Sequence, residues 1–125
     1  MNIQEALDMA DAMKPNMMER EVKIRFLQEL DGMIHDEIVM RHEHTAEEET
    51  APAYDSDTAG DTQLIIPAPY DMFYVYWLMS KIDLLNMEMD KYNNDRALFE
   101  SQYEQMSDWY TRTHMPIQNT REFML

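Results

Sequence analysis

Cysteine is absent from the 125-residue chain, and glycine is nearly so, with only Gly32 and Gly60. The absence of cysteine excludes a disulfide scaffold, a thiolate metal site and a cysteine nucleophile. The scarcity of glycine leaves little means of building tight hairpins or a glycine-rich phosphate loop. Outside the centre of the chain the remaining residues favour helix, so the sequence predicts an all-α fold.

Basic residues are also few, since 10 Lys and Arg stand against 25 Asp and Glu and the net charge is -15 at pH 7. A surface of this charge repels nucleic acid and anionic membranes unless its cations gather on one face. The cations are scattered along the sequence, which argues against a phosphate-binding module.

No long apolar run is present either. The longest, MFYVYWLM at residues 72–79, is far shorter than the roughly 20 residues that span a bilayer. The N-terminal residues include acids where a secretion signal needs positive charge. We therefore expect a soluble protein made in the cytoplasm, with no membrane partner.

Apolar residues at helical spacing predict two helices in the first third of the chain. The first covers residues 2–13 and ends before Pro15, while the second starts from Asn16 as its cap and ends near residues 41–44. Gly32 inside the second helix predicts a bend or a close approach of another helix. The apolar stripe of this helix is expected to comprise Val22, Phe26, Leu30, Met33 or Ile34, and Ile38.

Residues 42–66 form an acidic loop in this interpretation. No Lys or Arg occurs from residue 42 to residue 80, and the first part of this stretch mixes acids with small residues, Pro and Gly. Residues 64–67 (LIIP) are the only credible strand fragment, and Pro67 and Pro69 keep it short.

Two further helices are expected after the loop. Asp71 caps the third or lies in its first turn, and Asn86 separates it from a fourth whose apolar spacing runs from Met89 to Tyr110. Separate antiparallel helices are favoured, because one rod of about 40 residues would be about 60 Å long. The core face of the third helix is predicted to contain Phe73, Tyr76, Trp77 and Leu84. The chain thus reads as one helical domain, residues 1–114, in a compact bundle of about four helices, followed by a flexible tail, residues 115–125.

Candidate catalytic and metal sites are weak. Five residues could contribute metal ligands: His35, Asp36, His42, Glu43 and His44. His35 and His42 are seven residues apart, however, which is about 10 Å along a helix and too far for both to bind one ion. Asp31 and His35 have suitable spacing but no partner motif. An all-α nucleotide hydrolase would need paired ExxE motifs for magnesium, and Glu5, Asp8 and Asp11 have no counterpart. We assign no catalytic, cofactor or metal residue and expect a protein that is not an enzyme.

Methionines and aromatic residues are the main candidates for binding surfaces. The 14 methionines suit either core filling or a soft, adaptable surface; the candidates are Met17, Met18, Met72, Met79, Met87, Met89 and Met106. Tyr74, and one of Trp109 and Tyr110, fall off the best apolar stripes and are expected to face solvent or a neighbouring subunit.

The second half of the chain carries recognisable motifs: PAPYD at residues 67–71, an aromatic helix, KYNN at residues 91–94 and WYTRTHMP at residues 109–116. This half resembles the head-tail connector, or head-completion adaptor, proteins of tailed bacteriophages and prophages. Thr111 stands where Asn is more usual in that family.

The resemblance implies a structural subunit of the virion neck, at the capsid vertex. Such a subunit forms a ring with copies of itself beneath the portal protein and presents a docking surface to a stopper or tail-completion protein. Genomic DNA would pass through the channel without specific binding, which suits an acidic wall. The acidic side chains expected to face the channel or a neighbouring subunit are Glu43, Glu47, Glu48, Glu49, Asp55, Asp57 and Asp61.

The tail is the segment expected to grip the adjoining ring, with four apolar residues buried only in the complex: Ile117, Phe123, Met124 and Leu125. The main alternative function is a small acidic protein that mimics DNA and blocks a DNA-binding enzyme. Mimicry needs regular rows of carboxylates, whereas about a third of the acids here crowd into one loop. A metal-dependent nucleotide hydrolase is a third, weaker alternative.

Overall fold

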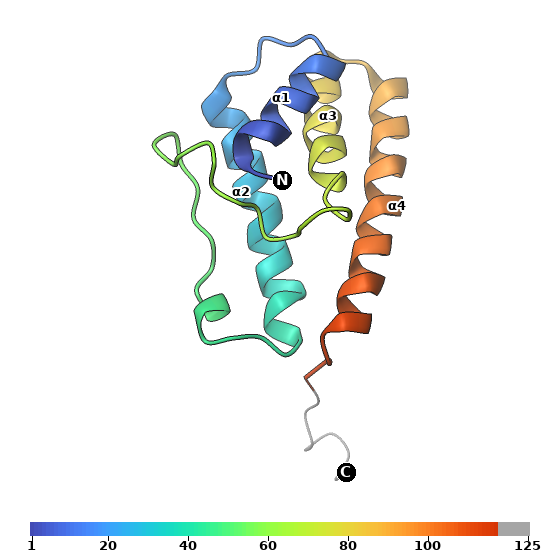
Figure 1. Ribbon diagram of the computed structural model, residues 1–125. Helices are drawn as coiled ribbons and strands as arrows, with labels where there is room; N and C mark the ends of the chain where they lie inside the picture. Colours follow the sequence, from blue (N-terminus) through green and yellow to red (C-terminus); the bar gives the residue numbers. More distant parts are fainter. Residues whose placement is uncertain (118–125) are drawn as a thin grey trace.

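A computed structural model of the protein describes residues 1–117. They form four α-helices, α1 (Ile3–Met13), α2 (Arg20–Glu37), α3 (Phe73–Leu85) and α4 (Met89–Thr113). Two short 3₁₀-helices, η1 (Val39–Arg41) and η2 (Glu47–Glu49), lie between α2 and α3. The described part contains no β-strand, and the helices pack into a bundle (Figure 1). The predicted all-α bundle of about four helices is confirmed. Among residues 1–117, no helix is both long and apolar enough to cross a membrane.

Helix α3 is the centre of the bundle and packs against α1, α2 and α4. Its sequence is apolar on nearly all sides, which is typical of a buried helix. The buried side chains therefore cover its whole circumference; they include Phe73, Tyr74, Val75, Trp77, Leu78, Met79 and Ile82. The prediction that Tyr74 faces solvent or a neighbour is wrong for this reason, because it assumed one buried face. Leu84, predicted to be in the core, is exposed near the end of the helix.

The turn between α1 and α2 is organised by Asn16 rather than capped by it. Helix α2 starts four residues later, at Arg20. The Asn16 side chain donates to the Lys14 carbonyl (2.8 Å) and accepts from the Met18 amide (3.1 Å). The predicted cap is therefore wrong, and Asn16 closes the turn instead. Similarly, the first turn of α3 has no side-chain cap, so Asp71 does not cap that helix.

Gly32 lies inside α2 without a close neighbour from another helix. A Cβ atom added at Gly32 would meet only the Gln28 side chain, at 3.7 Å, which is ordinary contact. The predicted close helix approach is therefore wrong. The buried face of α2 is also rotated from the predicted stripe, since Val22 and Met33 are exposed. Its buried members are Lys23, Ile24, Leu27, Leu30, Asp31, Ile34 and His35.

Helices α3 and α4 are separate and are joined by a tight turn, as the position of Asn86 predicts. Asn86 ends α3 and its amide donates to the Ile82 carbonyl. The next residue, Met87, has a φ of 58°, in the left-handed region that normally favours glycine. In Figure 1 this turn and the α1–α2 turn lie at the same end of the bundle, and the chain leaves α4 at the opposite end.

The long segment between α2 and α3 runs back along the helices. The predicted strand fragment at residues 64–67 is wrong, because Ile65 and Ile66 form a bend; the nearest pairing is an isolated bridge between Asn2 and Gln63. At the end of the bundle where α4 finishes, a second isolated bridge joins His42 to Pro116. The start of the tail is thus attached beside the end of η1.

Candidate interaction surfaces

A buried carboxylate fixes the central segment to the bundle. Asp31 on α2 is fully buried and accepts hydrogen bonds from the Tyr54 hydroxyl (2.6 Å), the Tyr74 hydroxyl (2.6 Å) and the Ile65 amide (3.1 Å). Burial raises the pKa of Asp31, although these hydrogen bonds oppose the shift. Burial and the nearby Asp31 in turn raise the pKa values of both tyrosines. Tyr74 is therefore a structural residue that links α3 to the segment, since its hydroxyl also accepts from the Ile66 amide (3.0 Å).

The polar side of α2 holds the acidic loop in place. The Gln28 side chain donates to the Pro52 carbonyl (2.9 Å) and accepts from the Tyr54 amide. His35 Nε2 donates to the Glu48 carbonyl (2.7 Å). The acidic side chains themselves point outward, since all seven are exposed: Glu43, Glu47, Glu48, Glu49, Asp55, Asp57 and Asp61. The backbone of the loop is thus bound to the helix while its charges remain in solvent.

An ion cluster lies beneath the turns that join the helices. Lys14 Nζ, at the end of α1, is 3.0 Å from Asp83 Oδ1 on α3 and 3.1 Å from Asp95 Oδ2 on α4. The Asp83 side chain is fully buried, and apart from Lys14 its oxygens have no hydrogen-bond partner in the described part of the chain. Burial, together with the neighbouring Asp95, raises the pKa of Asp83 to about 6. One cation thus holds three helices together while facing two carboxylates.

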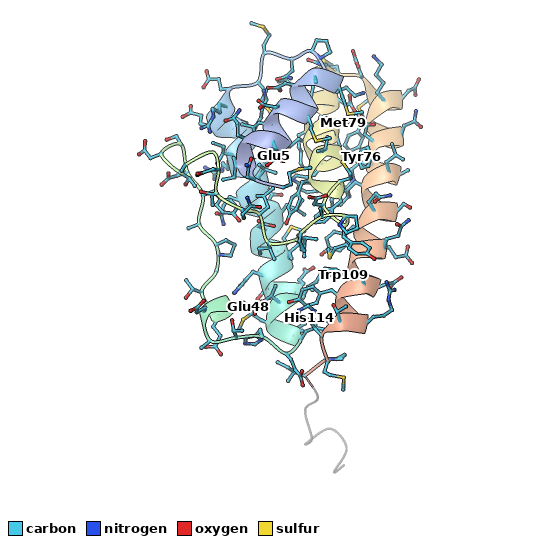
Figure 2. The ribbon with its side chains drawn as sticks, viewed as in Figure 1. Glu5, Glu48, Tyr76, Met79, Trp109 and His114 are labelled. Atoms are coloured by element: carbon cyan, nitrogen blue, oxygen red, sulfur yellow. The ribbon has the colours of Figure 1, made fainter. Side chains whose placement is uncertain are left out.

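Aromatic side chains near the C-terminal end of α4 join the first and last motifs of the second half. Tyr70, from PAPYD, stacks on Trp109 with ring centroids 4.7 Å apart. Tyr110 stacks on His114 at 3.9 Å. Tyr110 is buried, whereas Trp109 is half-buried, so Trp109 is the more accessible of the pair. Figure 2 shows Trp109, His114 and Glu48 at this end of the molecule.

The tail begins at the same end. The Ile117 amide donates to the Arg41 carbonyl (2.9 Å), and the Glu43 amide donates to the Met115 carbonyl (2.8 Å). The Ile117 side chain is exposed in the single chain, and its predicted burial in a complex stays a prediction. Phe123, Met124 and Leu125 lie outside the described residues.

The candidate metal ligands have other partners. His42 Nδ1 donates to the Ile38 carbonyl and His44 Nδ1 to the His42 carbonyl, each at 2.7 Å. Within residues 1–117, no three His, Asp or Glu side chains are arranged to hold a metal ion. Of the acids on α1, Asp11 pairs with Lys23 at 2.6 Å and Asp8 accepts from the Gln4 side chain.

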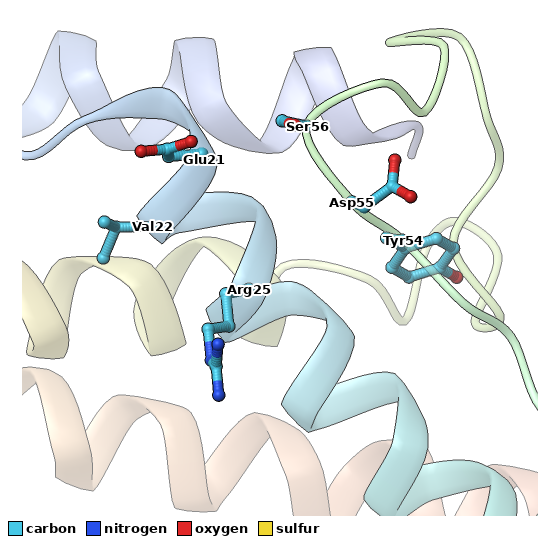
Figure 3. A pocket seen from close by; sticks show the side chains of 6 residues that line it. All are labelled: Glu21, Val22, Arg25, Tyr54, Asp55 and Ser56. Carbon is cyan, nitrogen blue, oxygen red and sulfur yellow. The ribbon is translucent and has the colours of Figure 1, made fainter.

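A polar pocket of about 340 Å³ lies between α2 and the acidic loop (Figure 3). Glu21, Val22 and Arg25 contribute from the helix, and Tyr54, Asp55 and Ser56 from the loop. A single arginine between two carboxylates does not make an anion site. We therefore assign this pocket no chemistry.

An apolar groove of about 550 Å³ lies between the start of α2 and the end of α3. Its apolar lining consists of Met17, Met18, Val22, Phe26, Leu84 and Leu85. Glu19 and Lys81 complete the lining. Of the candidate surface methionines, Met17 is 94% exposed and Met87 85% exposed, whereas Met79 and Met106 are buried in the core. The methionines are thus divided between the core and the surface.

The groove is the surface that sequence periodicity misses. Periodicity marks which face of a helix is apolar but does not show which part of that face another helix leaves uncovered. The available signal was the concentration of Met17, Leu84, Leu85 and Met87 around two turns, where polar residues are the norm.

No protein-family model, curated protein or solved structure matches the chain.

Proposed function

We propose that the chain is a head-tail connector subunit of a tailed bacteriophage or prophage, which forms a ring under the portal and offers a docking surface to the stopper or tail. The observation that carries the proposal is the resemblance of the second half, residues 65–116, to that family. The first and last motifs of the resemblance contact each other in the fold, because Tyr70 stacks on Trp109.

Two surface properties support a structural role in an assembly. The first is an apolar end with Met17 and Met87 almost fully exposed, which is costly for a protein that never meets a partner. The second is strong negative charge, -15 in total, which weakens contact with passing DNA. An alternative role as a DNA mimic needs carboxylates in regular rows. The outward acids of the central loop instead follow an irregular segment, which does not favour mimicry.

Deletion of residues 119–125 is expected to give a folded chain that no longer binds the portal. The four α-helices lie between Ile3 and Thr113, so the helical circular dichroism of the truncated chain should be unchanged. The apolar side chains Phe123, Met124 and Leu125 would be lost, and we propose that they are buried only in the assembly. Co-purification with the portal protein measures the effect, and replacement of Asn119 and Thr120 by Ala is the matched control. Undiminished portal binding by the truncated chain would exclude this role of the tail.

The acidic loop is proposed to face the DNA channel or a neighbouring subunit. Glu47, Glu48 and Glu49 are exposed on η2, whose backbone is held by His35. Replacing the three by Gln should therefore leave the fold intact and impair assembly, genome retention or DNA ejection in phage carrying the change. Normal results in all three assays would show that the loop does not have this position.

A further inference from the structure

The apolar groove has the properties of a binding site without an occupant. Its volume, about 550 Å³, is within the range of about 300 to 1,000 Å³ typical of binding pockets. Val22 and Phe26 lie one turn apart on α2, and Leu84 and Leu85 form the opposite wall at the end of α3. The walls thus come from two packed helices, so the groove is present before any ligand binds.

The ion cluster and a neighbouring turn support this end of the molecule. Lys14 binds Asp83 and Asp95 directly beside the segments that carry Met17 and Leu84. Met87 keeps a left-handed backbone, φ 58°, with its side chain 85% exposed, so packing within the described chain does not explain the methionine. Backbone strain of this kind is concentrated at functional positions. Both observations indicate a rigid apolar platform.

We propose that residues 118–125 of one copy bind in this groove on a second copy of the chain. The segment contains three consecutive apolar residues, Phe123, Met124 and Leu125, which suit an apolar groove. Its charged residues are Arg121 and Glu122, and those of the groove are Glu19 and Lys81. The side-chain charges of each side sum to zero, so docking avoids the side-chain repulsion expected between two acidic surfaces.

The reach of the tail makes the contact intermolecular. Ile117 lies beyond the C-terminal end of α4, while the start of α2 and the end of α3, which line the groove, lie at the other end of the bundle (Figure 1). The Ile117 amide is hydrogen-bonded to Arg41, and the stretch from Arg41 back to Val22 in the wall of the groove spans about 28 Å along η1 and α2 at 1.5 Å per residue. The six residues from Ile117 to Phe123 span at most about 21 Å. Phe123 therefore does not reach Val22, in the wall of the groove of its own copy.

Such a contact joins unlike surfaces, so its repetition closes a ring or extends a filament. The inference deepens the connector role and rests on it for its biological setting. It assigns the tail to a neighbouring subunit in the same ring rather than to the adjoining ring. Portal binding then depends on the tail indirectly, because the tail forms the ring and only a ring binds many portal subunits at once.

Two complementary variants of the full chain test the contact. Leu85→Glu damages the groove and leaves the tail intact, whereas Phe123→Glu damages the tail and leaves the groove intact. Each is expected to raise the dissociation constant of self-association at least about tenfold, because a carboxylate would enter an apolar site. Leu98→Glu is the matched control, since Leu98 on α4 is 45% exposed, similar to Leu85 at 54%, and lies outside the groove.

Sedimentation velocity over a concentration series gives the readout. The native chain and Leu98→Glu should associate, Leu85→Glu and Phe123→Glu should each remain monomeric, and a mixture of the last two should form a 1:1 dimer. A monomeric native chain, or a mixture that stays monomeric, would overturn the proposal. Association without portal binding would instead reject the connector role and leave the tail–groove contact in place.

Discussion

Replacing Lys14 by methionine is expected to lower the free energy of unfolding at pH 7.5 by about 3 to 5 kcal/mol, the usual effect of removing one partner from a buried ion pair. Lys14 is the cation placed between Asp83 and Asp95, at 3.0 and 3.1 Å. Methionine fills a similar volume, so the loss comes from two carboxylates left without a counter-charge. Urea denaturation followed by circular dichroism measures it.

An exposed ion pair provides the matched control. Lys91 Nζ lies 3.0 Å from Glu88 Oε2, the same distance as in the buried pair, but its side chain is 61% exposed. Lys91→Met should therefore change the free energy of unfolding by no more than about 0.5 kcal/mol. Equal effects of the two substitutions would contradict the structural importance of the cluster.

The ion cluster of Lys14, Asp83 and Asp95 is expected to make the stability of the fold depend on pH. The pKa of Asp83 is raised from 3.8 to about 6 in the folded state, so the folded chain binds more protons between these values. This group therefore stabilises the fold at low pH, and its contribution is lost as pH rises through about 6. Asp83→Asn should be more stable than the native chain by about 1 to 3 kcal/mol at pH 7.5 and lose this advantage near pH 4. The loss in Lys14→Met should likewise be smaller at pH 5 than at pH 7.5.

Replacing Asp31 by alanine is expected to lower the free energy of unfolding by about 3 to 5 kcal/mol, because it leaves three hydrogen-bond donors without their acceptor. Each donor that stays buried and unpaired costs about 1 to 3 kcal/mol. These donors are the hydroxyls of Tyr54 and Tyr74 and the amide of Ile65. The acceptor connects α2, α3 and the segment between them. Its removal should therefore also release the segment, with faster hydrogen exchange at the Ile65 amide.

The matched comparison is Tyr54→Phe, which removes one donor and leaves Asp31 bound to the other two. Its cost should be about 1 kcal/mol, the usual net contribution of one hydrogen bond. In a chain carrying Asp31→Ala, the further change Tyr54→Phe should cost almost nothing, since the hydroxyl has already lost its acceptor. Additive costs of the two changes would show that Asp31 and Tyr54 act independently.

The helices were predictable because their ends carry chemical signals. Pro15 and Asn86 interrupt apolar periodicity, and α1 and α3 end at Met13 and Leu85, just before them. The acidic composition of residues 42–66 also predicts a long excursion between helices. Its attachment to α2 was not predictable, because it depends on Gln28 and His35, whose polar side chains are equally common on solvent-exposed faces.

The candidate sites were harder to predict because they depend on which element is central. A helix buried on all sides has no outward face, so the off-stripe position of Tyr74 indicated exposure wrongly. Asp31 at four residues from His35 suggested at most a weak metal pair, whereas its partners are two tyrosines distant in sequence. The apolar groove depends on the relative positions of α2 and α3, which no local pattern contains.

The proposal that the chain is a subunit of a phage neck is tested most directly by quantitative mass spectrometry of purified phage particles produced from the genome that encodes the chain. The account predicts that the chain is present in mature particles, at a copy number that matches a ring on the portal. Absence of the chain from mature particles would contradict the account and would move an acidic inhibitor or a transient assembly factor to first place.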